Sequence, residues 1–215
     1  MIALLDYGAG NLTSVRKALS ALGTSTWTPE SPSELVRATG IIVPGVGHFE
    51  STAAIGQDWR AAIVEATRIN VPLLGICVGL QWLFEGSQES LTVPGLSLFK
   101  GTCFNFTEHV NGRLKVPHVG WNSLTLPRPT RLMQGVKSGD QVYFTHSFAA
   151  PVIDDTAAIC EYGVPFSAAV ERGHVSAVQF HPEKSGDVGL RILQNWIAQV
   201  KGPRQDLSRR SAGGA

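Results

Sequence analysis

Apolar residues in the first half of the chain form two kinds of pattern. Short continuous apolar runs predict buried strands, and apolar positions repeated every three or four residues predict helices. The predicted strands are residues 2–5, 41–43 and 71–76, and the predicted helices are residues 12–22, 59–69 and 79–84. Strands that alternate with helices indicate βαβ units, and therefore a parallel sheet covered by helices on both faces.

The middle of the chain, from residue 98 to about residue 171, has a different pattern. Short apolar runs at residues 103–106, 122–126 and 142–144 are separated by turns, which is typical of antiparallel strands. A further strand at residues 175–180 and a closing helix at residues 188–200 follow. We therefore expect an α/β fold of flavodoxin-like type, with a mostly parallel central sheet, helices on both faces and an antiparallel strand section. Residues 1–200 form one domain in this interpretation, and the polar residues 201–215 are expected to be a disordered tail.

Composition narrows the class of protein. The chain has 215 residues, of which 43% are hydrophobic and 16% are charged, and its formal net charge is +1. Such a balance favours neither nucleic acid nor a membrane surface as partner. No apolar run reaches membrane-spanning length, and the N-terminus has no secretion signal. The three cysteines are widely spaced and suggest neither a disulfide framework nor a zinc site, so we expect a cytoplasmic protein without metal or cofactor.

The strongest chemical signal surrounds Cys77, which lies between Gly75 and Gly79. A strand precedes this cysteine and a helix follows it, which is the arrangement of a nucleophile elbow with Cys in place of Ser. The helix N-terminus favours a thiolate, so a thiol pKa below about 8.5 is expected, and the N–H of Val78 points to where an oxyanion would form. The alternative is a buried structural cysteine, which is the interpretation adopted for Cys103 and Cys160.

A thiolate nucleophile needs a base and a group that orients the base. His181 follows an apolar strand, and Pro182 favours an extended conformation at His181. Residues i and i+2 of an extended chain point to the same side, so His181 and Glu183 can approach Cys77 together. Taken alone, the same residues also suit a polar surface turn. His48 and His146 lie near strand ends and are reserve candidates for the base.

A third element is Pro-Gly-Val-Gly at residues 44–47, again after a predicted strand. Its two glycines allow backbone N–H groups to approach a ligand closely, as in an oxyanion hole, although this pattern is also a common turn. Ligands bind beyond the carboxyl ends of parallel strands. Residues 6–11, 44–49 and Cys77 are therefore expected along one edge of the sheet.

Together, Gly-Ile-Cys-Val-Gly-Leu-Gln, Pro-Gly-Val-Gly and Gln-Phe-His-Pro-Glu resemble the class I (triad) glutamine amidotransferases, and the resemblance extends to about residue 200. It implies Cys77 as nucleophile, His181 as general base and acid, and Glu183 as the orienting carboxylate. The amides expected to stabilise the oxyanion are those of Val46, Gly47 and Val78. The resemblance further implies that L-glutamine is held by Gly47, Gln81, His146 and Ser147, the last two through their backbone.

Four further segments narrow the resemblance: Asp-Tyr-Gly-Ala-Gly-Asn, Pro-Gly-Val-Gly-His-Phe, Pro-His-Val-Gly-Trp-Asn and Glu-Lys-Ser-Gly. They are similar to the glutaminase subunits of imidazole glycerol phosphate synthase in histidine biosynthesis. In that family, ammonia passes to a (β/α)₈ barrel cyclase that makes imidazole glycerol phosphate and AICAR, here expected as a separate subunit of a heterodimer. Asn11, Trp121 and Lys184 are candidate interface residues, with Trp121 as anchor. The alternative for Trp121 is a place in the core.

Three other functions stay open from the sequence. The chain could serve a different amidotransferase of the same fold, with a chorismate-, nucleotide- or pyridoxal-forming partner. It could also be a non-catalytic binding subunit, or a general thiol hydrolase or esterase, because elbow geometry occurs there as well. The Asp-Tyr-Gly-x-Gly-Asn start argues against the first, and the intact His181 and Glu183 argue against the second.

Overall fold

A seven-stranded sheet forms the centre of the protein in the computed structural model, which describes residues 1–110, 112 and 114–202. Its strand order is β10-β11-β12-β4-β3-β1-β2. The parallel strands are β1 (Ile2–Leu4), β2 (Thr26–Trp27), β3 (Gly40–Gly45), β4 (Leu73–Cys77) and β12 (Val175–Val178). Strands β10 (Thr156–Glu161) and β11 (Pro165–Arg172) extend the sheet in antiparallel fashion.

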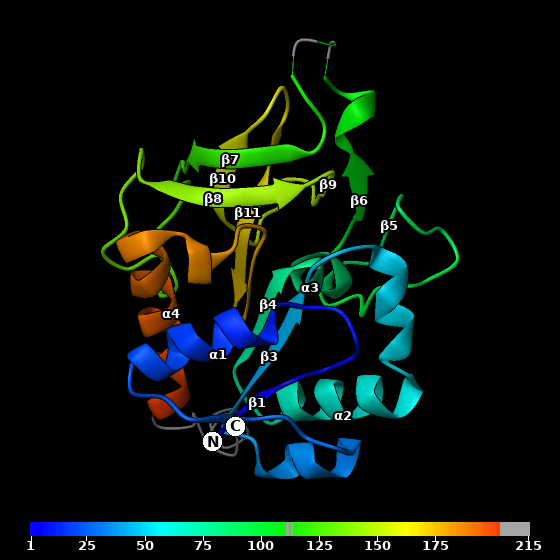
Figure 1. The fold of residues 1–215 in the computed structure, drawn as a ribbon, viewed down its shortest axis with the longest axis vertical. Coiled ribbons are helices and arrows are strands. Elements are labelled where there is room, and N and C mark those ends of the chain that lie inside the picture. The colour runs from blue at the N-terminus through cyan, green and yellow to red at the C-terminus, as the bar shows by residue number, and fades with distance from the viewer. Residues whose placement is uncertain (111, 113, 203–215) are drawn as a thin grey trace, which may run out of the picture.

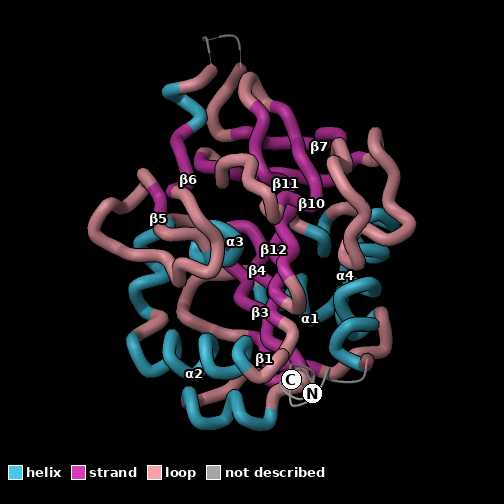
Figure 2. The backbone as a smooth tube through the Cα atoms, turned by 180° about the vertical axis from the view of Figure 1, so that it is seen from behind, coloured by secondary structure: helices cyan, strands magenta, loops and turns pink. Residues whose placement is uncertain are grey.

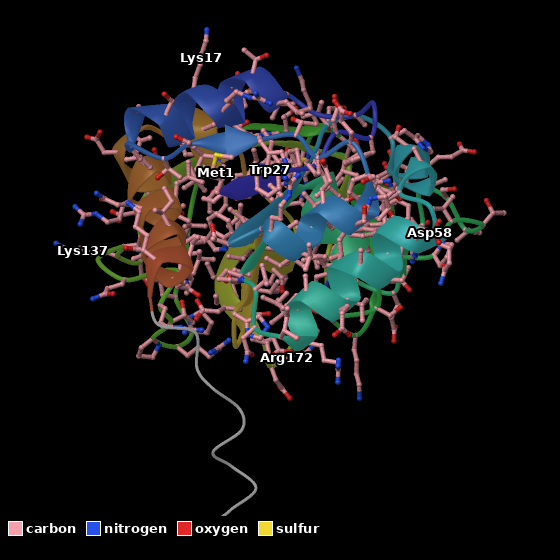
Figure 3. The ribbon with its side chains drawn as sticks, turned by 90° about the horizontal axis from the view of Figure 1, so that it is seen from below. Met1, Lys17, Trp27, Asp58, Lys137 and Arg172 are labelled. Atoms are coloured by element: carbon pink, nitrogen blue, oxygen red, sulfur yellow. The ribbon has the colours of Figure 1, made fainter. Side chains whose placement is uncertain are left out.

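Helices flank this sheet, and α1 and α2 lie on opposite sides of its strands (Figure 3). The α-helices are α1 (Leu12–Ala21), α2 (Gln57–Arg68), α3 (Val78–Leu83) and α4 (Gly186–Lys201). Four short 3₁₀ turns are η1 (Pro32–Arg37), η2 (Phe49–Ala54), η3 (Phe106–Glu108) and η4 (Pro182–Lys184). Among the described residues, no helix is both long enough and apolar enough to cross a membrane.

Two smaller sheets lie beyond the ends of the parallel strands. Strands β7 (His118–Ser123) and β8 (Gln141–His146) form an antiparallel pair, and β5 (Gly86–Ser87), β6 (Thr102–Asn105) and β9 (Phe148–Ala149) form a second sheet. The β7–β8 pair lies across the end of the sheet at which β1, β3 and β4 finish (Figure 1). The same arrangement is visible from behind, with β3, β4 and β12 leading up toward β7 and β11 (Figure 2). We call this end of the sheet the carboxyl edge.

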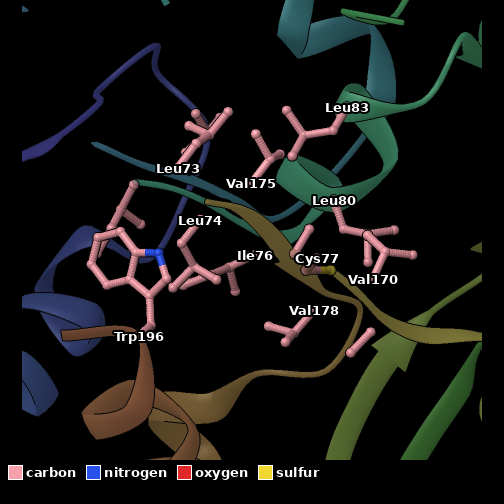
Figure 4. Close-up of a cluster of buried hydrophobic side chains, with 14 of the residues drawn as sticks. Leu73, Leu74, Ile76, Cys77, Leu80, Leu83, Val170, Val175, Val178 and Trp196 are labelled. Atoms are coloured by element: carbon pink, nitrogen blue, oxygen red, sulfur yellow. The ribbon is translucent and has the colours of Figure 1, made fainter. Parts of the chain in front are cut away.

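One part of the core consists of aliphatic residues of β4 and β12 packed against α4. Leu73, Leu74, Ile76 and Val178 are buried beside Trp196, and Cys77 lies at the end of this cluster (Figure 4). Such burial is worth about 1.5–3 kcal/mol for each large aliphatic side chain. Cys77 at the end of β4 is therefore held by a well-packed strand.

The predicted fold class is confirmed, and most predicted elements differ from the structure by one to three residues. The strand predicted at residues 122–126 is wrong in its bounds, because β7 runs over His118–Ser123. Beyond Ser123 the backbone makes only an isolated bridge, Thr125 with Ile159. Of the predicted tail, Lys201 ends α4, and residues 203–215 lie outside the described residues.

Candidate active site

Cys77 is the last residue of β4, and α3 begins at the next residue. Its backbone has φ 55° and ψ −109°, a left-handed conformation that costs about 1–3 kcal/mol in a residue other than glycine. Two glycines make this turn possible. A Cβ on Gly75 would lie 2.6 Å from the carbonyl oxygen of Gly79, and a Cβ on Gly79 would collide with the carbonyl of Val43. The tight turn expected of a nucleophile elbow is therefore present at Cys77.

His181 and Glu183 form a buried pair beside this elbow. Nδ1 of His181 lies 2.9 Å from Oε1 of Glu183, and each side chain is only 1% exposed. Burial disfavours the imidazolium, but the interactions of His181 with Cys77 and with Glu183 outweigh burial and raise the pKa of His181 to about 9. Nε2 of His181, the ring nitrogen that does not face Glu183, is buried and has no hydrogen-bond partner among the described residues. The structure thus brings together the three residues that the sequence predicts as a triad.

The geometry of this pair differs from the expected one. His181 is extended, with φ −96° and ψ 98°, but Glu183 lies inside the 3₁₀ turn η4 and not on a continuing strand. The turn is anchored to β8, because His181 N–H donates to Tyr143 O at 2.9 Å and Tyr143 N–H donates to Ser185 Oγ at 3.0 Å. The expectation that residues i and i+2 meet through strand alternation was wrong. The tight turn at Pro182 brings the carboxylate back to the imidazole instead.

The two reserve histidines occupy other environments. His48 is exposed, and its Nδ1 accepts a hydrogen bond from Glu50 N–H at the start of η2. His146 is buried, its Nδ1 lies 2.8 Å from Phe148 O, and its Nε2 lies 3.1 Å from Nδ1 of His118. Burial lowers the pKa of His146 to about 3 and that of His118 to about 4, so both rings are neutral at pH 7. His181 is therefore the histidine best placed to act on Cys77.

The residues predicted to form the oxyanion hole lie around the elbow. Gly45 of β3 is in register with Cys77, so Val46 and Gly47 leave the sheet directly beside the thiol. Gly47 has φ +97°, a conformation that favours glycine, and Val78 begins α3. The structure thus places all three residues next to Cys77 in the chain or in the sheet, and their role as oxyanion donors stays a prediction.

The predicted glutamine contacts are only partly free to bind a ligand. Nε2 of Gln81 donates to Phe148 O at 2.9 Å and to Oε1 of Gln179 at 3.2 Å, whereas Oε1 of Gln81 is buried without a partner among the described residues. Gln81 thus offers an acceptor and not a donor. The ring of His146 faces inward, so His146 can contact a ligand through its backbone, and Ser147 next to it is half-buried.

Two groups next to the sulfur were not predicted from the sequence. Nε2 of Gln179 lies 3.7 Å from Sγ of Cys77, and the buried hydroxyl of Tyr7 has no hydrogen-bond partner among the described residues. Burial first, and then the charge on Cys77, raises the pKa of Tyr7. A Cβ on Gly45 would lie 2.5 Å from this hydroxyl, so Tyr7 packs against the end of β3. Gln179 is the first residue of the Gln-Phe-His-Pro-Glu segment. Its contact with Cys77 depends on the register between β12 and β4, which the sequence does not show.

Two of the three predicted interface residues, Trp121 and Lys184, lie against Tyr143 of β8, and the third, Asn11, lies at the start of α1. Trp121 is 54% exposed on β7 and packs edge-on against Tyr143 of β8, with ring centroids 6.2 Å apart. Nζ of Lys184 lies 6.0 Å from the Tyr143 ring centroid. Asn11 caps α1, its side chain accepting from Ser14 N–H at 3.1 Å. Trp121 is therefore a surface residue, and the core alternative is wrong for it.

Among the described residues, no group of three or more His, Cys, Asp or Glu side chains is arranged to hold a metal ion. The three cysteines are free and buried, and burial raises the pKa of the Cys103 and Cys160 thiols. A thiol whose ionisation is disfavoured is a poor nucleophile. This fits the structural role expected for Cys103 and Cys160.

Known proteins resemble the chain over nearly its whole length. The chain is 43% identical to the imidazole glycerol phosphate synthase subunit HisH of Moorella thermoacetica over 204 residues, covering 93% of this chain and 95% of the relative. The subunits of the same name from Thermococcus kodakarensis and Desulfitobacterium hafniense are 44% and 42% identical. They cover 91% and 98% of this chain, and 98% and 100% of their own lengths.

Solved structures show the same fold at low sequence identity. A crystal structure of a glutamine amidotransferase matches with a TM-score of 0.72 at 17% identity, covering 94% of this chain and 99% of that chain. The structure of PurLQS from Thermotoga maritima matches with a TM-score of 0.69 at 20% identity, covering 92% and 97% respectively. The family model for class-I glutamine amidotransferases matches residues 3–200. This chain therefore belongs to the class-I glutamine amidotransferase family.

Proposed function

We propose that this chain is the glutaminase subunit of an imidazole glycerol phosphate synthase, and that Cys77, His181 and Glu183 are its catalytic residues. The observation that carries the residue assignment is the strained elbow at Cys77 next to the buried His181–Glu183 pair. The identity of 41–44% to several HisH subunits supports this function over that of another amidotransferase of the same fold. In this function the chain works in the cytoplasm and needs no cofactor.

The reaction begins when the thiolate of Cys77 attacks the side-chain amide carbon of glutamine. The carbonyl oxygen becomes an oxyanion, which the N–H of Val78 and an amide from Val46 or Gly47 stabilise. A pKa of about 9 keeps His181 protonated at neutral pH, so its imidazolium can donate the proton that the leaving ammonia takes. The result is a glutamyl thioester on Cys77, ammonia and a neutral His181.

Water then completes the cycle. Neutral His181 removes a proton from a water molecule, the hydroxide attacks the thioester, and the carbon–sulfur bond breaks to release glutamate and the thiolate. Glu183 holds the imidazole through Nδ1 and stabilises its charged form in both steps. The free acceptor Oε1 of Gln81 suits an N–H group of the bound glutamine.

Ammonia is useful to a synthase only if it stays unprotonated, so it must reach the second active site without crossing bulk water. The partner in this proposal is a separate (β/α)₈ barrel cyclase that uses the ammonia to make imidazole glycerol phosphate and AICAR. We place its docking surface at the carboxyl edge, around Asn11, Trp121 and Lys184. An exposed tryptophan beside a lysine is the kind of anchor that interfaces enrich.

Labelling of the nucleophile tests the chemistry. A glutamine-like diazo-ketone should modify Cys77 and spare Cys103 and Cys160, which mass spectrometry of the peptides would reveal. Cys77→Ala should abolish synthesis from glutamine, whereas synthesis from added ammonium should survive with the cyclase present. Label found mainly on Cys103 or Cys160 would refute the assignment. Loss of the ammonium-dependent reaction would instead mean that the cyclase itself is inactive in the assay.

A further inference from the structure

Two buried glutamine side chains lie behind the candidate nucleophile and form a pair. Gln81 and Gln179 are almost fully buried, at 2% and 0% exposure. Strand register explains why Gln179 is there, because β12 pairs with β4 in parallel with Val178 opposite Ile76. One residue further along each strand are Gln179 and Cys77, and Nε2 of Gln179 lies 3.7 Å from Sγ of Cys77.

The direction of the hydrogen bonds in this pair follows from one carbonyl group. Phe148 O can only accept, so the amide atom of Gln81 that lies 2.9 Å from it must be the NH₂ group. The same NH₂ group lies 3.2 Å from Gln179, which must therefore present its Oε1 there. The NH₂ group of Gln179 is then the part of its amide that faces Cys77. The orientation of the Gln179 amide is therefore set by its hydrogen-bond partners, although its oxygen and nitrogen have nearly the same size.

Phe148 O also fixes the tautomer of His146. Nδ1 of His146 also lies next to Phe148 O and must carry a hydrogen to donate to it, which leaves Nε2 of His146 as an acceptor. That acceptor receives a hydrogen from Nδ1 of His118 at 3.1 Å. Burial keeps both rings neutral at pH 7, and the acceptor role of Nε2 requires the neutral form of His146. Phe148 O thus accepts hydrogen bonds from both Gln81 and His146, which fixes the amide orientation of Gln81 and the tautomer of His146.

We propose that Gln179 is a further catalytic residue, whose side-chain N–H donates a hydrogen bond to the Cys77 thiolate. This inference rests on the proposed role of Cys77 as nucleophile. A hydrogen bond to the charged form of a group favours that form, so the donor raises the fraction of thiolate available for attack. It also holds the sulfur at one position on the strained elbow. No proton moves in this role, because an amide does not titrate near neutral pH.

The test compares Gln179→Met, Gln179→Glu and the control Ser176→Ala. Methionine keeps the length of the side chain and removes the donor, and Gln81 retains its bond to Phe148 O. Glutamate keeps the shape and the acceptor for Gln81 but places a carboxylate beside the thiolate. Ser176 is a buried polar residue of the same strand without a hydrogen-bond partner among the described residues, so it controls for general disturbance of β12.

The measurement is the rate at which iodoacetamide alkylates Cys77 as a function of pH, followed by mass spectrometry of the Cys77 peptide. Gln179→Met should react about tenfold more slowly at pH 7 and approach the unmodified chain at high pH, because only thiolate formation is impaired. Gln179→Glu should be slower still at pH 7, and Ser176→Ala should match the unmodified chain. A purely structural role would lower the rate by a similar factor at every pH.

The diazo-ketone experiment and the pH profile distinguish a failure of the proposed function from a failure of the role of Gln179. If the diazo-ketone does not label Cys77 in the unmodified chain, the proposed function is wrong at its first step. If it does label Cys77 and the pH profile of Gln179→Met coincides with that of the unmodified chain, only the role of Gln179 is refuted. Should Gln179→Met be too unstable to purify, Gln179→Glu decides, because a profile unchanged by the added carboxylate would also overturn the proposal.

Discussion

Replacement of Trp121 by alanine tests whether this residue stabilises the complex with the partner or the fold of the free subunit. Trp121 is 54% exposed, and its main described contact is the edge-on packing against Tyr143 at 6.2 Å. An aromatic pair of this kind contributes about 0.5–1.5 kcal/mol. The free subunit should therefore lose on the order of 1 kcal/mol of unfolding free energy. In a chain of this size that lowers the melting temperature by about 2–4 °C.

The effect on the complex should be larger than the effect on the subunit. Residues that anchor an interface lose about 2 kcal/mol or more on truncation to alanine, which weakens binding roughly 30-fold. Isothermal titration of the barrel cyclase with the variant measures this change directly. Glutamate release and imidazole glycerol phosphate formation, followed in the same reaction, should also lose their one-to-one ratio, because ammonia escapes from a loosened interface.

Trp196 provides the matched control. It is fully buried on α4, so Trp196→Ala should cost about 3–5 kcal/mol in the free subunit and lower its melting temperature strongly. If Trp121→Ala melted like Trp196→Ala, Trp121 would be a packing residue. If Trp121→Ala bound the cyclase as tightly as the unmodified chain, the docking surface would have to lie elsewhere.

Three further predictions concern the catalytic pair and the elbow. His181→Asn should lower glutaminase activity in the complex by roughly 10²–10⁴-fold, and Glu183→Gln should lower it less; the reverse order would mean that the two roles are misassigned. The pKa of His181 is raised to about 9, so the stability from its protonated form is fully present below about pH 6.5 and is lost as pH rises through about 9. The free energy of unfolding, measured with urea across this pH range, should fall in the unmodified chain and not in His181→Asn. The same pH dependence in both proteins would contradict the raised pKa. Gly79→Ala should destabilise the subunit by about 1–3 kcal/mol, because the new methyl group meets the carbonyl of Val43, whereas Gly56→Ala in open space should cost less than about 1 kcal/mol by the same assay.

The sequence was most informative where local pattern and chemistry coincide. The elbow could be predicted because glycines two residues before and two residues after a cysteine are typical of such a tight turn. In the structure, a Cβ on Gly75 or on Gly79 would collide with nearby backbone atoms. The alternation of strands and helices likewise predicted the parallel part of the sheet, because both faces of such a sheet are covered and its strands are continuously apolar.

The pairing of strands that are distant in the sequence could not be predicted from the sequence. Strands β10 and β11 join the edge of the main sheet, yet nothing in residues 156–172 distinguishes that pairing from a separate hairpin. Gln179 has the same difficulty, since its contact with Cys77 spans 102 positions of the chain. The exposure of Trp121 also depends on which face of β7 is covered, and alternation alone leaves both faces possible.

The register of the central sheet explains why such distant residues form one site. Gly45 pairs with Cys77 across β3 and β4, and Val178 pairs with Ile76 across β12 and β4, so Gly45, Cys77 and Gln179 leave three neighbouring strands at the same level. A slip of one residue in either pairing would move a strand by about 3.3 Å and turn its side chains to the other face. Misplacement of a reacting group by about 1 Å can already cost on the order of 100-fold in rate. The backbone hydrogen bonds of three buried strands therefore hold the proposed nucleophile, the proposed oxyanion donors and Gln179 in position, and the turn η4 needs only to return Glu183 to His181.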